Sequence, residues 1–457
     1  MADAAKASSH DGLARERSRT LFVLWTTYGS FYLCRANLGP VRSTMQSSLG
    51  LTAVEIGLVF GAVKLGYALG QLVNGQLTER YGARRILAVG MLGSAAATLL
   101  LAAAPLLQGV PLFAPFASWI GSAVGGALAG SSGVASTRSI LGVLLVLAFA
   151  NGFFQAGGWP PCVKIAARWF PVERRGFTMG VLGTSLTLGS AITIGVVGGL
   201  LSVVGGWRVA FVVPAFLLAA SFSHTVLRLR EAPPRAETTE GPLTPDKLPL
   251  SVALRATLGN PRIWVLAFGL FGLDAVRYGF LDWAPGHLEE VQHSSAWASA
   301  LKAAVFPLAG ALGALSSGWI TDRFFQSRRA PVCAILLVAV AALTLAYRVV
   351  VDLGAVPTVV CLALVGYCLY GAQILLVGTA AQDFARKGAT AAAAGFVDFT
   401  GHVGAFTGDV VTGRMLRTHG WAGAIVWWAS AAFVAALLVS SLWNARPAEK
   451  EARLRQA

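Results

Sequence analysis

The segment NGQLTERYG (74–82) recurs in altered form as SGWITDRFF (317–325), 243 positions later. In both copies a glycine is followed, several residues on, by an acidic residue and an arginine at the end of an apolar run. A charged turn repeated at one offset indicates a duplicated chain, in which each half contains the same series of helices. Two such halves, related by an axis along the membrane normal, form one of the known plans of secondary transporters.

The composition is that of a membrane protein. The 457 residues are 55% hydrophobic and only 12% charged, whereas soluble domains carry about 25% charged residues. Long apolar runs separated by short polar turns predict twelve transmembrane helices and therefore an all-α membrane fold of two six-helix halves. We expect the spans near residues 20–38, 56–77, 86–105, 139–158, 176–203, 207–227, 263–284, 295–319, 331–351, 356–380, 391–415 and 421–443.

The distribution of basic residues predicts the orientation. The net charge is +15, and most of the 36 Lys and Arg fall in loops on the side that holds both termini. Cytoplasmic loops carry this excess, so both termini are expected in the cytoplasm. The positive charge is thereby explained without nucleic acid as a partner. Residues 1–19 are polar and basic, with no cleavable signal peptide evident.

The two halves differ in length by roughly 30 residues, because later motifs repeat at a shorter offset. ERRGF (173–177) is echoed by ARKGA (385–389), an offset of 212. The surplus is assigned to residues 105–138, a Gly-, Ala- and Ser-rich segment expected to be an extracytoplasmic loop that transport does not require. The predicted domains are a tail (1–19), a first bundle (20–227), a cytoplasmic linker (228–262), a second bundle (263–443) and a tail (444–457).

One arginine lies within an apolar run in each half. Arg35 ends the run 20–38, and Arg277 lies inside 265–283, 242 positions later. An arginine at bilayer depth costs at least ~2.5–3.5 kcal/mol, so intramembrane arginines are commonly functional. The planar guanidinium binds phosphate or carboxylate oxygens in pairs. Although a snorkelling helix-end residue or a structural ion pair is the alternative, the pattern favours a central site that holds an anion from both halves.

Other ionisable residues in apolar runs are candidates for the same site. Lys64 and Lys302 either add charge to the cavity or pair with Asp274 or Asp398. Asp274 is three residues before Arg277, and so shares its helix face; restraint of that arginine is favoured over contact with a cationic substrate group. Asp398 and His402 are four residues apart, and form either a proton-coupling pair or a hydrogen-bonded structural pair.

Several chemistries have no motif in this sequence. The five cysteines have no metal-ligand spacing and are interpreted as free buried thiols. No nucleophile–base pair, metal cluster or phosphate-cradling glycine loop is present, so neither an enzyme, a metal site nor a cofactor is predicted. The acid–arginine turns are instead expected to form salt bridges that open and close at the cytoplasmic side: Glu79, Arg80, Asp322 and Arg323.

With these residues in view, the chain resembles the organophosphate:phosphate antiporters of the major facilitator superfamily. This group includes glycerol-3-phosphate and hexose-phosphate transporters, and the resemblance covers nearly the whole chain except residues 105–138. The matching segments are FYLCRAN (31–37), FQAGGWPPC (154–162), ERRGF (173–177), RYGFLDWAP (277–285), SGWITDR (317–323) and AAAAGF (391–396).

The resemblance implies roles for particular residues. Arg35 and Arg277 match the arginines that hold phosphate, and the tyrosines that line the family site match Tyr28, Tyr32 and Tyr67. Ser185 stands where glycerol-3-phosphate members have a histidine and the glucose-6-phosphate type a serine. The chain also departs from the family. A common lysine falls at Gln71, with Lys64 seven residues earlier, and a common glutamate falls at Pro307. The substrate therefore need not be that of any known member.

The leading hypothesis is an antiporter in the bacterial inner membrane that acts as a monomer. It would exchange a phosphorylated organic anion, such as a sugar phosphate, glycerol phosphate or phosphoglycerate, for inorganic phosphate. One alternative is a proton-coupled symporter of a phosphonate or carboxylate, motivated by Asp398 and His402. A second alternative is a membrane sensor of organic phosphates, because the family includes such receptors.

Overall fold

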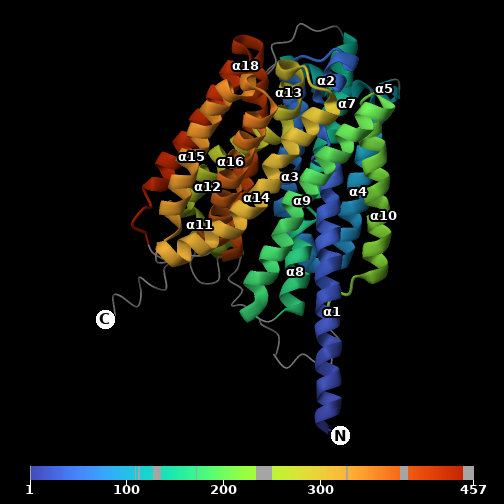
Figure 1. The fold of residues 1–457 in the computed structure, drawn as a ribbon. Coiled ribbons are helices and arrows are strands. Elements are labelled where there is room, and N and C mark those ends of the chain that lie inside the picture. The colour runs from blue at the N-terminus through green and yellow to red at the C-terminus, as the bar shows by residue number, and fades with distance from the viewer. Residues whose placement is uncertain are drawn as a thin grey trace.

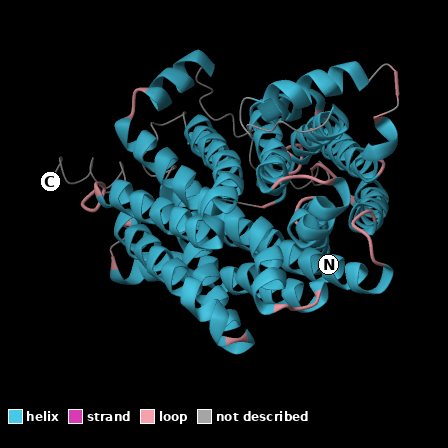
Figure 2. Cartoon of the chain, turned by 90° about the horizontal axis from the view of Figure 1, so that it is seen from above, coloured by secondary structure: helices cyan, strands magenta, loops and turns pink. Residues whose placement is uncertain are grey.

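The computed structural model describes residues 2–108, 110–111, 114–126, 135–170, 172–232, 250–325, 328–380 and 390–445, and in these ranges the chain is helical without strands (Figure 2). The helices lie roughly side by side, with the N-terminal part of α1 projecting at the lower end in Figure 1. In the first half they are α1 (Ala2–Phe31), α2 (Leu38–Leu49), α3 (Ala53–Tyr81), α4 (Ala83–Ala102), α5 (Ala104–Leu107), α6 (Ala114–Val124), α7 (Ala135–Gln155), α8 (Trp159–Trp169), α9 (Val172–Val204) and α10 (Val209–Arg228).

The second half repeats this pattern of long and short helices. Its elements are α11 (Leu250–Leu258), α12 (Pro261–Tyr278), the π-helical turn η4 (Gly279–Trp283), α13 (Ala284–Gln292), α14 (Ala296–Phe324), α15 (Arg329–Val350), α16 (Ala355–Ile374), the π-helical turn η6 (Leu375–Ala380) and α18 (Thr390–Ser440). Two short 3-10 turns complete the set, η1 (Tyr32–Cys34) and η5 (Val351–Leu353).

The number of membrane-crossing helices agrees with the predicted twelve. In the described part of the chain, ten helical segments are long and apolar enough to cross a membrane. The last of these, Ala393–Ser440, is two helices joined at Gly420, where φ is 64°. The twelfth is α1, whose apolar part is short because the helix ends at Phe31. The protein is therefore an integral, multi-pass membrane protein.

Helix starts follow from local sequence. Thr52 and Glu55 form a capping box at the start of α3, in which the Thr52 hydroxyl accepts from the Glu55 backbone N–H at 3.2 Å. Asn260 caps α12 by a single bond, in which its Oδ1 accepts from the Arg262 N–H at 3.1 Å. All five cysteines are free thiols, as expected, and four of them are buried.

The first and second halves pack closely through two helix pairs, α3 against α18 and α9 against α14. Glycines make the first contact possible. A Cβ added to Gly57 would lie 2.4 Å from the backbone oxygen of Asp409, and one added to Gly413 would lie 2.4 Å from that of Ala53. Such small residues let membrane helices approach to backbone contact. At the end far from the N-terminus, α2 also packs against α13 (Figure 1).

The prediction that residues 105–138 form a surface loop is wrong for part of the segment. Residues Ala114–Val124 form the apolar helix α6, which packs against α7. The contact is backbone to backbone, since a Cβ on Gly142 would lie 1.7 Å from the carbonyl oxygen of Ala117. Gly142 therefore lets this run of small and apolar residues pack as a helix directly against α7. Residues 109, 112–113 and 127–134 lie outside the described residues.

Candidate anion-binding site

Arg35 is buried in the interior and lies just beyond the end of α1. The α-helix ends at Phe31, the 3-10 turn η1 follows, and Arg35 caps that turn with φ −121° and ψ −50°. Arg35 is 8% exposed, and its guanidinium lies over the ring of Tyr67 at 4.1 Å. Nη1 donates to the hydroxyl of Tyr32 at 3.2 Å, whereas Nη2 has no hydrogen-bond partner. A buried, partly unsatisfied guanidinium is costly unless an anion completes its hydrogen bonds.

Arg277 occupies the matching place in the second half. It lies in the last turn of α12, directly before the π-helical turn, and is 5% exposed. Its Nε is 3.3 Å from Oδ1 of Asp274, the neighbour that the three-residue spacing predicts, although neither atom makes a hydrogen bond. The guanidinium lies over the ring of Tyr278 at 4.4 Å. Single π-helical turns inside helices are frequent at functional sites.

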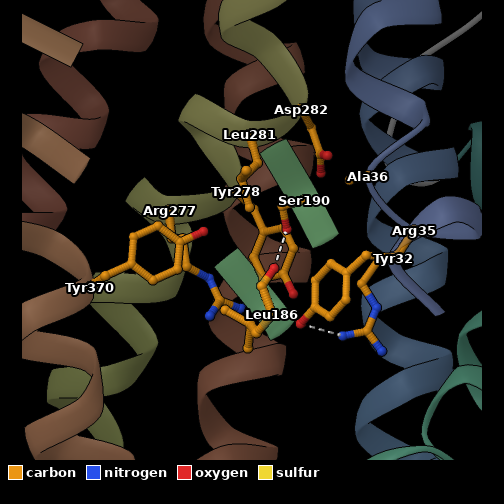
Figure 3. A pocket seen from close by; sticks show the side chains of 10 residues that line it. All are labelled: Tyr32, Arg35, Ala36, Leu186, Ser190, Arg277, Tyr278, Leu281, Asp282 and Tyr370. Carbon is orange, nitrogen blue, oxygen red and sulfur yellow. Dashed lines mark hydrogen bonds between the residues drawn. The ribbon is translucent and has the colours of Figure 1, made fainter. Parts of the chain in front are cut away.

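Both arginines line one pocket between the halves, and they approach it from opposite sides (Figure 3). The internal volume is about 10 Å³, which is space for roughly one water molecule. An organic phosphate would therefore require the surrounding side chains to move apart. The lining residues are Tyr32, Arg35, Ala36, Leu186, Ser190, Arg277, Tyr278, Leu281, Asp282 and Tyr370.

An aromatic contact joins the halves beside this pocket. Tyr67 on α3 stacks on His402 of α18, with ring centroids 4.4 Å apart and an interplanar angle of 23°. Nδ1 of His402 lies 3.0 Å from the backbone oxygen of Asp398 and 3.6 Å from its carboxylate. The Asp398 side chain keeps 24% of its surface exposed. His402 is therefore fixed by local contacts and by the tyrosine of the other half.

Lys64 is paired, as one of its two alternatives had it, but its partners are not Asp274 and Asp398. Its ammonium bonds the carboxylate of Asp282 and lies 3.1 Å from Oδ2 of Asp409. The α3 helix places Lys64 opposite η4 and the middle of α18, whereas Asp274 lies more than two turns before Asp282, beside Arg277. The sequence pattern located the lysine but could not say which acidic residues of the second half would face it.

Three other predicted residues lie outside the pocket. Lys302 bonds Gln292 Oε1 and Ser294 Oγ, both at 2.6 Å, in the connection between α13 and α14. Ser185 is buried and donates to the backbone oxygen of Leu182 at 2.6 Å. Tyr28 packs between Tyr32 and Trp159, one helix turn below the pocket residue Tyr32.

The predicted gating turns are only partly visible. The side chains of Glu79 and Asp322 lie outside the described residues, whereas Arg80 and Arg323 are exposed. A different pair joins the halves at the α2–α13 end. There Arg42 is bonded to Glu290, and the hydroxyl of the adjacent Ser43 donates to Glu289. Within the described residues, no group of three His, Cys, Asp or Glu side chains is arranged to hold a metal ion.

Sequence reasoning missed Asp282, Asp409, Ser190 and Tyr370 as residues of the site region. Asp282 stands in the matched segment RYGFLDWAP, five residues after Arg277, and Asp409 is an ionisable residue within an apolar run. The criterion that singled out Arg35 would therefore have found both carboxylates. Ser190 and Tyr370 carry no such signal, because serines and tyrosines are common in apolar helices.

Comparison with known proteins agrees with this architecture. Residues 24–409 match the family model described as Major Facilitator Superfamily. The glycerol-3-phosphate transporter of Bacillus subtilis (strain 168) is 27% identical over 449 residues, covering 94% of this chain and 93% of the relative. A probable hexose phosphate transport protein of Chlamydia trachomatis is 25% identical, with 94% and 91% covered.

Two further similarities concern a sensor and a solved structure. The membrane sensor protein UhpC of Escherichia coli (strain K12) is 24% identical, with 94% of this chain and 93% of the relative covered. The crystal structure of a bacterial homologue of the human lysosomal transporter Spinster, inward-facing and unoccupied, superposes with a TM-score of 0.68 at 18% identity, covering 94% and 95% of the two chains. The chain therefore belongs to the Major Facilitator Superfamily, and its relatives are consistent with the organophosphate:phosphate antiporter family.

Proposed function

We propose that the protein is a secondary transporter that exchanges a phosphorylated organic anion for inorganic phosphate. One observation carries this proposal: Arg35 and Arg277 come from opposite halves, are both buried, and line the same pocket. Each guanidinium retains a nitrogen without a hydrogen bond, Nη2 of Arg35 and Nε of Arg277. Relatives with the names glycerol-3-phosphate transporter and probable hexose phosphate transport protein support the substrate class.

The chemistry of the pocket favours a phosphate group. Guanidinium forks match two oxygens of a phosphate, and hydrogen bonds to such charged oxygens are about twice as strong as neutral ones. The hydroxyls of Tyr32, Tyr278 and Tyr370 supply further donors around the same space. An anion placed between the arginines also screens their mutual repulsion, which lowers the cost of bringing the two halves together.

The packing supports alternating access around this site. Among the described residues, four hydrogen-bonded or ionic contacts between the halves lie toward the α2–α13 end: Arg42–Glu290, Ser43–Glu289, Lys64–Asp282 and Lys64–Asp409. By the distribution of basic residues this end faces away from the cytoplasm. The structure then corresponds to a state closed on the outside, and substrate exchange requires rocking about the central site. We place the protein in a bacterial inner membrane, as a monomer with both termini cytoplasmic.

Counterflow in proteoliposomes tests the proposal. Vesicles loaded with unlabelled inorganic phosphate should take up labelled phosphate, and external glycerol-3-phosphate, glucose-6-phosphate or phosphoglycerate should compete if it is a substrate. Galactonate, a carboxylate without phosphate, is the matched competitor that should have no effect. Phosphate exchange would be refuted if uptake were the same with and without internal phosphate, or if galactonate were the only compound to compete. Protein-free vesicles give the background.

A further inference from the structure

Three ionisable side chains meet in the interior between the halves. Lys64 comes from α3, Asp282 from the π-helical turn η4, and Asp409 from α18. Their side chains are 4%, 3% and 0% exposed, respectively. Water is therefore excluded from a cluster that contains one ammonium group and two carboxylates. We refer to these three residues as the buried triad.

The neighbours of the buried triad supply one hydrogen bond but no second cation. Nε1 of Trp283 donates to Oδ1 of Asp409 at 3.0 Å. The rings of Tyr278 and Phe60 lie 4.7 Å and 5.5 Å from the Lys64 ammonium. In the part of the chain that the structure describes, no other Lys, Arg or His nitrogen lies within 4.0 Å of either carboxylate.

The nearest cations on the surrounding helices are engaged elsewhere. Arg277 on α12 lies against Asp274, and Arg42 on α2 is bonded to Glu290. Arg35, after η1, donates to Tyr32. On α18, two turns before Asp409, His402 contacts the backbone of Asp398. With both carboxylates ionised, the buried triad would therefore carry an uncompensated negative charge.

Such a charge is unstable in a dry interior. Moving an ionised carboxylate out of water costs several kcal/mol even after relaxation, so an unpaired buried carboxylate takes up a proton instead. Oδ2 of Asp409, although 3.1 Å from the lysine, makes no hydrogen bond. We propose that Asp282 and Asp409 share one proton, so that the buried triad is a neutral proton-binding site between the two halves.

The position of the buried triad couples this proton to the movement of the halves. Lys64 belongs to the first half and both carboxylates to the second, so separation at this end removes the lysine and admits water. Two hydrated carboxylates then no longer require the proton. Closing this end therefore takes up a proton, and opening it releases one.

The same position couples the proton to the anion, a step that rests on the proposed function. Asp282 lines the pocket together with Arg35 and Arg277 (Figure 3). An anion held by the arginines lies next to this carboxylate, and repulsion between like charges favours the protonated form. Anion and proton should thus bind cooperatively, and phosphate exchange should be accompanied by proton movement.

Infrared spectroscopy tests the proton site without any ligand. Purified protein in detergent, at neutral pH and free of phosphate, should show the carbonyl stretch of a protonated carboxylic acid, shifted in D₂O. The wild-type-minus-variant difference spectrum should show this band for both D409N and D282N, because either change leaves Lys64 with one carboxylate and no need for a proton. D398N is the matched control and should leave the band unchanged.

Two further variants keep the test decisive if an Asp→Asn protein fails to fold. W283F removes the donor to Asp409 and should shift the band, whereas K64Q leaves two carboxylates without a cation and should increase it. Absence of the band in wild type would overturn the proposal. So would a band that disappears in D398N but persists in both triad variants.

Calorimetry then tests the coupling with inorganic phosphate as the probe. On the alkaline side of the infrared transition, wild type should take up more protons per bound phosphate than D409N, measured as the dependence of binding heat on the ionisation heat of the buffer. Any proton that phosphate itself gains or loses on binding is the same for wild type and D409N, so it cancels in the difference between them. If wild type showed no binding heat with phosphate, phosphate exchange would be contradicted. The proton site would then be judged by the infrared result alone. Equal proton uptake by the two proteins would refute the coupling.

Discussion

Arg35 and Arg277 keep guanidinium nitrogens without hydrogen bonds, whereas Lys64 is enclosed by two carboxylates. The first arrangement suits a residue that receives a ligand, and the second suits a residue that joins the two halves in the closed state. Both kinds of residue are charged and buried, so burial by itself does not separate them. The difference is whether the protein supplies the counter-charge.

R277K and R35K are each expected to lower phosphate exchange strongly while leaving the protein folded. Lysine keeps the charge but loses the two-pronged hydrogen bonding, a loss of about 1.5–3 kcal/mol, or roughly 10- to 150-fold in affinity. Labelled-phosphate counterflow measures this change. R348K, at the exposed end of α15, is the matched control. Exchange near the wild-type rate in either pocket variant would contradict the two-arginine site.

K64Q is expected to destabilise the protein, and a second change at Asp282 is expected to restore much of the loss. Breaking a buried ion pair costs about 3–5 kcal/mol, because the carboxylate that is left must either stay charged without a partner or take up a proton. Thermal unfolding in detergent should show a lower midpoint for K64Q and recovery in K64Q/D282N. If K64Q/D274N recovered stability and K64Q/D282N did not, the Lys64–Asp282 contact would not be the one that determines stability.

At the scale of helices, glycines set how closely the halves approach. Gly57 faces the backbone of Asp409 from the other half, whereas Gly183 on α9 has nothing within 4 Å of an added Cβ. The two positions therefore separate an effect on closure from the general effect of a methyl group in a helix. The same contrast applies to Gly142, which contacts α6 rather than the other half.

G57A is expected to hold the halves apart at the α2–α13 end, since its Cβ would lie 2.4 Å from a carbonyl oxygen. Spin labels on the exposed positions Ser47 and Thr418, in a background without cysteine, report this distance. The distance distribution should shift to longer values in G57A and remain unchanged in G183A. An unchanged distribution in G57A would show that this contact does not limit closure.

Replacing residues 108–135 with a short Gly/Ser turn is expected to preserve phosphate exchange but lower the unfolding temperature. The reason is that α6 covers Gly142 of α7 and has no described contact with the pocket residues. Counterflow and thermal unfolding of the same preparation measure the two effects. Loss of exchange in protein that inserts normally would place this segment in the transport cycle.

For the molecule as a whole, the buried triad predicts a conformational response to pH. Its protonated form is the closed form, so acidification should increase the closed population at the α2–α13 end, and alkalinisation should decrease it. The Ser47–Thr418 label pair should show shorter distances at lower pH in wild type and little change in D409N. A D409N protein that responds to pH as wild type does would assign the response to other groups.

The sequence by itself determined the number of membrane helices, the duplicated halves and the two central arginines. These features depend on hydrophobicity and on the spacing of residues along one chain. Insertion of a helix into the membrane depends on the same properties. It also indicated Asp274 beside Arg277, since residues three apart share a helix face.

Only the tertiary structure decided which residues of one half meet those of the other. Lys64 faces Asp282 and Asp409 instead of Asp274 and Asp398, and Lys302 lies outside the pocket although it resembles Lys64 in the sequence. Contacts between helices depend on their relative rotation and depth, and these are set by backbone approach at glycines such as Gly57 and by the extra residue of a π-helical turn. Hydrophobic spacing carries no information on either, because a helix can satisfy the same pattern at many rotations against its neighbour.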